Sequence, residues 1–277
     1  MKSAQKEKLL SYFQNNYQYE IPFFQRSYVW DEENWELFRE NLDEEVDAHN
    51  NQDDSEHFIG TIITKPLTQS GFDTVKHELI DGQQRLTTIT IILKALADTV
   101  TGKLPNLKNN LLGYLIFQDT QGKEYLRLTH SKLDAPYYQK VMKVLKEDEQ
   151  VEKADHQMVR AYYYFKDTFS EFTDEQRDIY SKVLLHKLPV IAMFLAENDD
   201  EQEIFDTINS LGVRLTISEL LKNYIFRDDE LKPLYEEYWF NLFESEEEDT
   251  NFWNATKTSG RIKRTNLELL LYCVLII

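Results

Sequence analysis

One run of this chain constrains its fold more than any other: a strand passes through a glycine turn directly into a long apolar helix. The strand is VKHELI (75–80), the turn is DGQQR (81–85), and the helix begins with LTTITIILKALADTV. Four apolar side chains recur in this helix at the three- and four-residue spacing of a single face: Leu86, Ile89, Leu93 and Leu96. The run predicts a strand, a tight turn and a core helix in immediate succession.

Other segments predict further strands and helices. HFIGTIITKP (57–66) alternates and is rich in β-branched residues, which favours a strand, and residues 66–73 have the length of a hairpin connection. LPVIAMFLA (188–196) is a continuous apolar run, typical of a strand that is buried on both faces. We expect a short helix at 4–14 and a mostly helical region at 101–185.

Capping residues mark the starts of other helices. Asp31 is placed to cap a helix whose apolar residues share one face: Trp35, Phe38, Leu42 and Val46. Thr216 and Glu219 have the T-x-x-E spacing of a capping box. Residues 199–212 are acidic at the start and end in glycine, which predicts another helix. Beyond residue 230 we expect acidic helices, broken by the basic stretch SGRIKRTN.

Composition limits the possible functions. The 277 residues include 31 Lys and Arg against 49 Asp and Glu, a net charge of −18, which disfavours a protein whose whole surface grips DNA. The single Cys273 excludes an internal disulfide and a cysteine-rich zinc site. The start lacks a secretory apolar region, and the longest apolar run, 267–277, is too short to cross a bilayer. We therefore expect a cytoplasmic protein, and a fragment of a longer one.

Several catalytic signatures are absent from the sequence. It has no G-x-x-x-x-G-K-[ST] loop, no G-x-G-x-x-G, no H-E-x-x-H, no C-x-x-C pair and nothing like an H-N-H nuclease signature. Its six histidines lack metal-ligand spacing, which favours surface or core roles for them. An ordinary P-loop NTPase, a zinc protein and a self-contained nuclease of that type are therefore disfavoured.

The glycine turn is the strongest candidate for chemistry. Gly82 permits a bend that residues with a Cβ resist, and the helix start that follows is a ready anion site. Arg85 stands in the first helical turn, where its positive charge opposes the helix dipole, and a bound phosphate would explain it. Asp81 is placed to orient a cation or a water. Alternatively, Asp81 merely caps the helix and Arg85 forms a surface ion pair.

Two further segments add polar groups. Gln25 and Arg26 follow a proline and two aromatic residues, although aromatic–arginine clusters commonly pack for structure alone. FDTINSLGVRLTISELLKN (205–223) joins two predicted helices and offers Asn209 and Ser210 near a helix end. Taken alone, a plain helical hairpin with a glycine cap explains that stretch better than a ligand does.

Together these segments resemble the signature series of a known family. IPFFQRSYVW, FIGTIITKP, HELIDGQQRLTTITIILKAL and FDTINSLGVRLTISELLKN, in this order, resemble the N-terminal domain of GmrSD-type, modification-dependent (type IV) restriction proteins. The layout is also similar to that of the ParB-like superfamily. The resemblance covers residues 10–100 and 186–227, and D-G-Q-Q-R-L-T-T is its most specific part. Sulfiredoxin, in the same superfamily, carries a cysteine in this turn, and the glutamine here argues against redox chemistry.

The resemblance implies a domain that binds, and in some members hydrolyses, a nucleoside triphosphate. In the family this domain is coupled to a C-terminal H-N-H-type nuclease that attacks modified phage DNA. That nuclease is not among these residues, so we expect no DNA cleavage by this chain alone, DNA contact through the full-length protein, and no membrane partner. The matching nucleotide-binding positions are Gln25, Arg26, Gly82, Gln83, Gln84, Arg85, Asn209, Gly212 and Lys222.

The expected fold is α+β: a small mixed ParB-like sheet with flanking helices, a mainly helical insertion and a C-terminal helical segment. Residues 1–100 would form the first part of a nucleotide-binding core and residues 101–185 the insertion. Residues 186–227 would supply a strand and a helix pair that complete the core. Residues 228–277 would begin a truncated helical domain.

Three functions remain open at this point. In the first, a regulatory NTPase of phage defence holds a triphosphate and Mg²⁺, with Asp81 and Arg85 as catalytic residues and Asp81 and Asp206 as candidate metal ligands. In the second, the Arg and Gln residues contact DNA or a modified base without nucleotide hydrolysis, helped by three basic residues: Arg261, Lys263 and Arg264. In the third, the motif positions are structural parts of a non-enzymatic interaction domain.

Overall fold

The chain folds into two compact units. The first contains residues 1–22 and 27–199, and the second contains residues 23–26 and 200–277. The computed structural model describes residues 3–14, 17–52, 58–67, 75–102, 104–118, 122–142, 155–196, 199, 216–226, 229–259 and 262–275. Our division of the chain into four segments stays a prediction.

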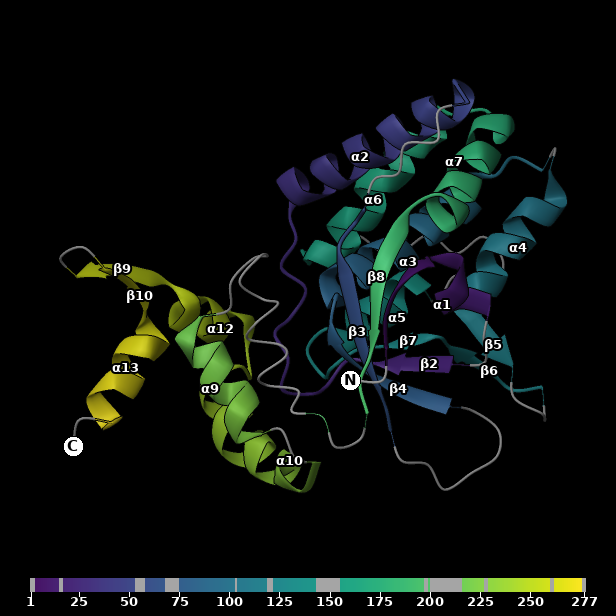
Figure 1. Ribbon diagram of the computed structural model, residues 1–277. Coiled ribbons are helices and arrows are strands. Elements are labelled where there is room, and N and C mark those ends of the chain that lie inside the picture. Colours follow the sequence, from purple (N-terminus) through teal and green to yellow (C-terminus); the bar gives the residue numbers. More distant parts are fainter. Residues whose placement is uncertain are drawn as a thin grey trace. The chain divides into compact units, whose positions relative to one another are not determined.

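A six-stranded mixed sheet forms the base of the first unit (Figure 1). Its strands, in spatial order, are β1 (Ser3–Lys8), β8 (Pro189–Phe194), β3 (Thr61–Pro66), β4 (Val75–Asp81), β2 (Tyr17–Glu20) and β7 (Leu128–Thr129). The pairs β1–β8 and β3–β4 are antiparallel, and the other neighbours are parallel. β5 (Ile116–Gln118) and β6 (Glu124–Leu126) form a separate antiparallel ribbon. The mixed sheet and its helices confirm the predicted α+β class.

The helices of the first unit gather around α3, the helix that follows the glycine turn. They are α1 (Leu10–Gln14), α2 (Glu32–Asn50), α3 (Gln83–Thr99), α4 (Pro105–Leu115), α5 (Ala135–Met142), α6 (Gln157–Ser170) and α7 (Asp174–His186). α3 packs against α4, α5, α6 and α7. The four predicted stripe residues of α3 are buried, as are residues on its other faces, such as Ile91 and Ile92. α3 is therefore a central helix rather than a one-sided surface helix.

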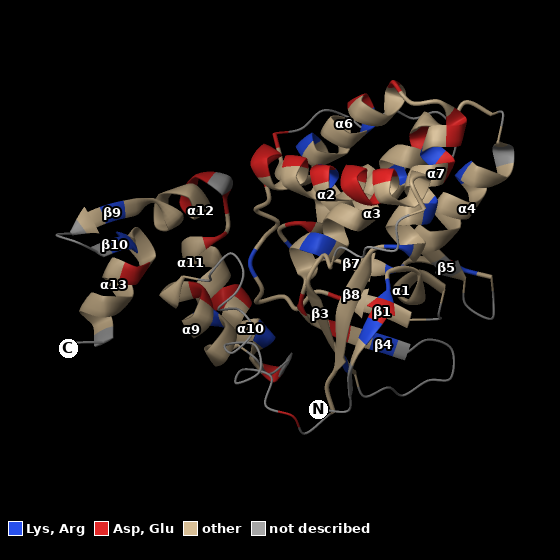
Figure 2. Cartoon of the chain, turned by 45° about the horizontal axis from the view of Figure 1, so that its top comes forward, with Lys and Arg blue, Asp and Glu red and all other residues tan. Residues whose placement is uncertain are grey.

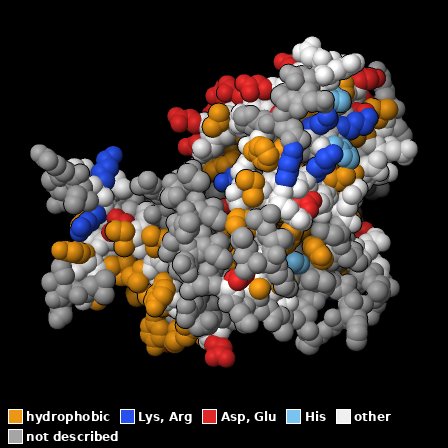
Figure 3. All heavy atoms as spheres, in the orientation of Figure 1, with side chains coloured by type: hydrophobic (Ala, Val, Ile, Leu, Met, Phe, Trp, Pro, Cys, Tyr) orange, Lys and Arg blue, Asp and Glu red, His pale blue; other side chains and the backbone are white. Residues whose placement is uncertain are grey.

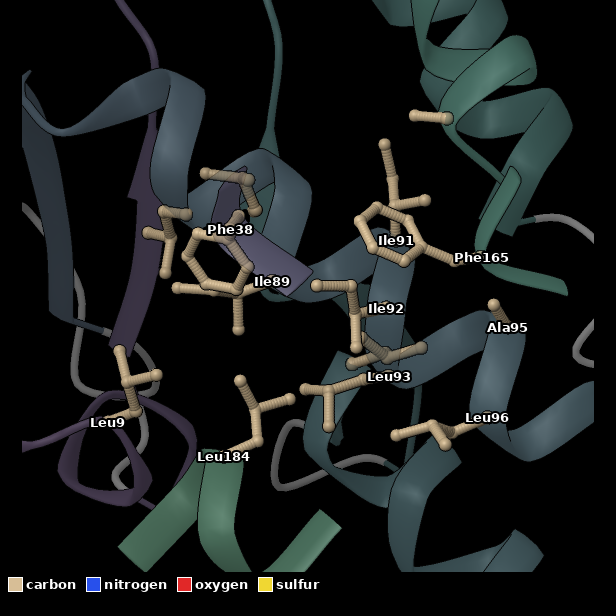
Figure 4. Close-up of a cluster of buried hydrophobic side chains, with 14 of the residues drawn as sticks. Leu9, Phe38, Ile89, Ile91, Ile92, Leu93, Ala95, Leu96, Phe165 and Leu184 are labelled. Carbon is tan, nitrogen blue, oxygen red and sulfur yellow. The ribbon is translucent and has the colours of Figure 1, made fainter. Parts of the chain in front are cut away.

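Figure 4 shows this core, in which side chains of α3 pack with side chains from several other elements. Those labelled from outside α3 are Leu9, Phe38, Phe165 and Leu184. The one cation in the middle of α3, Lys94, is fully buried, and it donates a hydrogen bond to Asp98 one turn later. Tyr162 of α6 also donates to Asp98, at 2.6 Å. A buried charge is tolerated here because it is paired and hydrogen-bonded.

The prediction of a helix at residues 4–14 was wrong over its first half. Ser3–Lys8 is strand β1, paired along six residues with β8, and only Leu10–Gln14 is helical. The partner of β1 lies about 185 residues away in the chain, and such pairing overrides local propensity. For β8 the strand itself is confirmed, but Ile191 is 41% exposed, so one face is only partly covered.

The second unit is largely helical, as expected for its sequence. Its elements are α9 (Ile217–Ile225), η2 (Asp229–Leu231), α10 (Lys232–Leu234), the π-helical turn η3 (Tyr235–Phe240), α11 (Asn241–Phe243), α12 (Glu247–Asn254), β9 (Thr256–Ser259), β10 (Ile262–Thr265) and α13 (Asn266–Leu275). The capping box of Thr216 and Glu219 is present at the start of α9. Sequence reasoning missed the β9–β10 hairpin. The predicted helix at 199–212 lies outside the described residues, apart from Asp199.

An aromatic cluster forms the core of the second unit. Its buried members are one leucine, Leu267, and four aromatic residues: Phe24, Phe226, Tyr235 and Trp239. Large apolar side chains also gather on the face of this unit that is visible in Figure 3. Among the helices that the structure describes, none has both the length and the apolar character needed to span a bilayer.

Candidate functional site

The predicted turn joins β4 to α3 through a single residue. Gly82 has φ 93° and ψ 9°, in the left-handed region that favours glycine. A Cβ at this position would meet the carbonyl oxygen of Thr61 at 3.0 Å and Cγ1 of Ile62 at 3.1 Å. Glycine is therefore required here both for the backbone angle and for the close approach of β3.

The start of α3 is the place where the sequence predicted an anion site. Its N-cap is Gly82, which has no side chain with which to cap the helix. The N-cap position is thus taken by Gly82 and not by Asp81, which is the last residue of β4. The first turn of a helix presents backbone N–H groups that lack partners within the helix, together with the positive end of its dipole.

Arg85 is held against β3 by a hydrogen bond to the first residue of that strand. Its Nη1 donates to the carbonyl oxygen of Thr61 and lies 3.8 Å from Oδ2 of Asp81. The side chain keeps 25% of its surface exposed. A guanidinium carries five N–H donors, so one bond to a carbonyl does not exhaust its capacity. The ion pair of the alternative interpretation is therefore present, with 3.8 Å between Nη1 of Arg85 and Oδ2 of Asp81. Anion binding by Arg85 stays a prediction.

Gln84 anchors residues 27–30, here called the 27–30 segment, to the first turn of α3 through hydrogen bonds. Its Oε1 accepts from the backbone N–H groups of Val29 at 2.9 Å and Trp30 at 3.3 Å. Its Nε2 donates to the carbonyl oxygen of Ser27 at 3.1 Å. The side chain is buried, so its amide holds the backbone, and its part in binding a nucleotide stays a prediction.

A second anchor of the 27–30 segment was missed in the sequence. Oδ2 of Asp134 accepts from the backbone N–H of Tyr28 at 2.7 Å. Two imidazoles flank this carboxylate: Nδ1 of His130 lies 3.8 Å from Oδ2, and Nε2 of His156 lies 3.4 Å from Oδ1. The only local signal for this group was the spacing of four residues from His130 to Asp134. His156 is distant in the sequence, because it lies at the start of α6.

The surroundings of Asp134 keep it ionised. Burial by itself would raise its pKa, but the interactions with His130 and His156 outweigh burial and lower the pKa to about 2. Burial also lowers the pKa of His130, despite the opposing effect of Asp134, so His130 is neutral near pH 7. A charged acceptor makes a stronger hydrogen bond than a neutral one, so ionisation of Asp134 strengthens its bond with the backbone N–H of Tyr28.

Lys222, a predicted nucleotide-binding residue, lies in the second unit and has a carboxylate partner there. Its Nζ contacts Oε1 of Glu244 at 2.8 Å, and the Lys222 side chain is only 6% exposed. Glu244 also accepts from the Tyr235 hydroxyl at 2.6 Å and from Nε1 of Trp239 at 3.1 Å. These contacts explain the conformation of Lys222 without a nucleotide.

The other predicted site residues are distributed as follows. Gln83 begins α3, beside Gly82. Gln25 and Arg26 lie in a loop of the second unit, and Gln25 is buried. Three predicted positions lie outside the described residues: Asp206, Asn209 and Gly212. In the described part of the chain, no three His, Cys, Asp or Glu groups are arranged to hold a metal ion.

Fold and turn together define an α+β domain built around a glycine-capped central helix. The family model described as the N-terminal domain of the GmrSD restriction endonuclease matches residues 7–226, most of the chain. The chain therefore belongs to the GmrSD N-terminal domain family, as its motifs predicted. No curated protein matches it.

Proposed function

We propose that this chain binds a nucleoside triphosphate at the first turn of α3, as the regulatory and recognition domain of a phage-defence restriction protein. The observation that carries the proposal is the glycine-capped start of α3, with the guanidinium of Arg85 held at its first turn. Helix N-termini and guanidinium groups both favour phosphate. Membership of the GmrSD family supports the role in restriction.

In this account the charges of the triphosphate are offset by Arg85, which belongs to the turn itself. The part of Arg26 in binding the triphosphate stays a prediction. Asp81 would be the described carboxylate that holds Mg²⁺, whose charge would offset that of the phosphates, while the second predicted ligand, Asp206, lies outside the described residues. Hydrolysis of the triphosphate would depend on positioning and charge stabilisation, with Asp81 and Arg85 as the catalytic pair.

A thermal-shift screen tests the proposal directly. The chain is heated with ATP, GTP, CTP or UTP in the presence of Mg²⁺, and with Mg²⁺ alone as the control. A nucleotide present at one hundred times its dissociation constant should stabilise the fold by about 2.7 kcal/mol. If none of the four triphosphates raises the melting temperature, the chain is not a nucleotide-binding domain.

One observation favours DNA contact as a second candidate function. In the β9–β10 hairpin Lys257 is directly opposite Arg264, and Lys263 is opposite Thr258 (Figure 2). Like charges directly opposite each other destabilise an antiparallel pair, and a phosphate backbone would offset that cost. Binding to DNA through this hairpin should weaken steeply with salt, whereas binding in a nucleotide pocket should weaken much less.

A further inference from the structure

A hollow of about 780 Å³ lies within the first unit, where the start of α2 packs beside α6 (Figure 1). The α2–α6 hollow, as we call it, is lined by Asp31, by three residues of α2 and by one side of α6 from Gln157 to Asp167. That stretch of α6 is about 15 Å long at 1.5 Å per residue. Small-molecule sites have volumes of about 300–1,000 Å³, so the hollow has room for an elongated organic molecule.

Aromatic side chains form part of the lining. Trp35 is buried, and Tyr163 and Tyr164 are half-buried. The ring centroids of Trp35 and Tyr164 are 5.8 Å apart, and Nε of Arg39 donates to the Tyr164 hydroxyl at 3.2 Å. These contacts hold Trp35 and Tyr164 in place. Aromatic rings of this kind attract cations to their faces and pack against alkyl chains.

Carboxylates surround the same hollow on both helices. The four acidic lining residues are Asp31, Glu32, Glu33 and Asp167. The one basic lining residue, Arg160, forms an ion pair with Asp155. Within the described ranges, no cation pairs with Glu32, Glu33 or Asp167. Figure 2 shows further acidic residues along α2. The α2–α6 hollow therefore carries an excess of negative charge that the described chain does not neutralise.

Helix polarity explains only some of these charges. Glu32 and Glu33 lie in the first turn of α2, where carboxylates offset the positive end of the helix dipole. Asp167 lies in the last turn of α6, which contains no basic residue, so its charge adds to the negative end of the dipole. Burial and the charge of Asp167 together raise the pKa of the Tyr163 hydroxyl. A cation bound beside Asp167 would offset a charge that is otherwise unfavourable there.

We propose that the α2–α6 hollow binds a linear aliphatic polyamine, a molecule whose ammonium groups are joined by alkyl chains. The alkyl chains would lie against Trp35, Tyr163 and Tyr164, and the ammonium groups would pair with Asp167 and with the carboxylates at the start of α2. A single metal ion fits less well, because the residues that the structure describes include no three His, Cys, Asp or Glu groups arranged to hold one. The proposal is independent of the nucleotide site.

Titration calorimetry with spermidine, in the absence of any nucleotide, tests the proposal. The salt concentration is about 0.15 M, at which attraction between exposed charges is screened beyond about 8 Å. Glu33→Gln and Asp167→Asn each remove one carboxylate and retain the size of the side chain, so each should weaken spermidine binding about threefold to fivefold. Tyr163→Leu removes the ring and retains apolar bulk, and it should weaken binding about threefold.

Glu40→Gln is the matched control for Glu33→Gln. Glu40 is an exposed glutamate of the same helix that does not line the hollow, so the two variants have the same net charge. Glu40→Gln should bind spermidine as wild type does. The melting temperature of each variant without spermidine shows that it is folded. Equal weakening by the two substitutions would overturn the site, because spermidine would then follow only the net charge of the chain.

Two further probes separate a polyamine from other cations. Mg²⁺ that replaces part of the salt at constant ionic strength should leave most of the spermidine bound, since it has no alkyl chain to pack on the rings. A tetralysine peptide carries the ammonium and alkyl groups of a protein partner, and it should bind more weakly than spermidine. Full displacement by Mg²⁺, tighter binding of tetralysine, or no binding of spermidine by wild type would each overturn the proposal.

Discussion

The guanidinium of Arg85 lies so close to Gly60 that a Cβ at residue 60 would come within 2.8 Å of Arg85 Cζ. Gly60 precedes β3, the strand whose first residue, Thr61, accepts a hydrogen bond from the same guanidinium. The orientation of Arg85 thus depends on a residue 25 positions away that has no side chain. This relationship gives a way to move the arginine without removing it.

Gly60→Ala should displace Arg85 and weaken nucleotide binding. Gly60 has φ 111° and Gly102 has φ 94°, so alanine at either position costs about 1–3 kcal/mol of backbone strain. Only the Cβ at residue 60 meets another residue, and it meets the movable end of a side chain. Denaturant unfolding should give the two variants similar free energies of unfolding, while calorimetry finds weaker binding for Gly60→Ala alone. Equal affinity in both variants would contradict this arrangement of Arg85.

Asp134 should make stability depend on pH in the acid range. Its pKa is lowered from 3.8 to about 2 in the folded chain, so the ionised form stabilises the fold above pH 4. This contribution, about 2 kcal/mol, is lost as the pH falls from 4 toward 2. The free energy of unfolding of wild type should exceed that of Asp134→Asn by its largest margin above pH 4, and the margin should shrink by about 2 kcal/mol at pH 2. A margin that stays constant over this range would contradict the lowered pKa.

Lys222 should matter for stability even in the absence of a nucleotide. Lys222→Met leaves Glu244 buried without its cation, and removing one member of a buried pair costs about 3–5 kcal/mol. Adding Glu244→Gln to the same chain removes the uncompensated charge and should restore much of the loss. Thermal denaturation of the single and double variants measures both effects. A fully stable Lys222→Met variant would show that the pair does not support the second unit.

A charge reversal in the β9–β10 hairpin distinguishes contact with DNA from a purely structural role of its basic residues. Lys257→Glu places an acidic residue opposite Arg264, which should stabilise the hairpin by about 0.2–1 kcal/mol. If the hairpin contacts DNA, the same change should weaken binding and reduce the slope of log affinity against log salt by about 1 to 2. Lys187→Glu, the same charge change at an exposed residue of the first unit, is the control. Equal effects of the two substitutions on DNA affinity would argue against a role for the hairpin.

The parts of the fold that the sequence predicted are those whose signals are local. The strand, glycine and helix of residues 75–99 follow one another without a break, and each has its own pattern. Capping boxes such as that of Thr216 and Glu219 are equally local, since both partners lie within one turn. Such features need no knowledge of the rest of the chain.

The parts that it did not predict depend on distant partners. β1 is polar, and it becomes a strand only because β8 provides an edge for it. Gln84 contacts Val29 across 55 residues, and Asp134 contacts Tyr28 across 106 residues. A glutamine in a phosphate-binding motif looks the same whether it binds a ligand or a backbone. Only the fold distinguishes these roles for Gln84.

The most direct test of the nucleotide site is titration calorimetry with Arg85→Ala. Arg160→Ala is the matched control, because Arg160 is 58% exposed on α6. With the nucleotide that gives the largest thermal shift, and with Mg²⁺, Arg85→Ala should bind at least about tenfold more weakly than wild type, while Arg160→Ala binds as wild type does. Unchanged binding by Arg85→Ala would contradict the assignment of the first turn of α3 as the phosphate site.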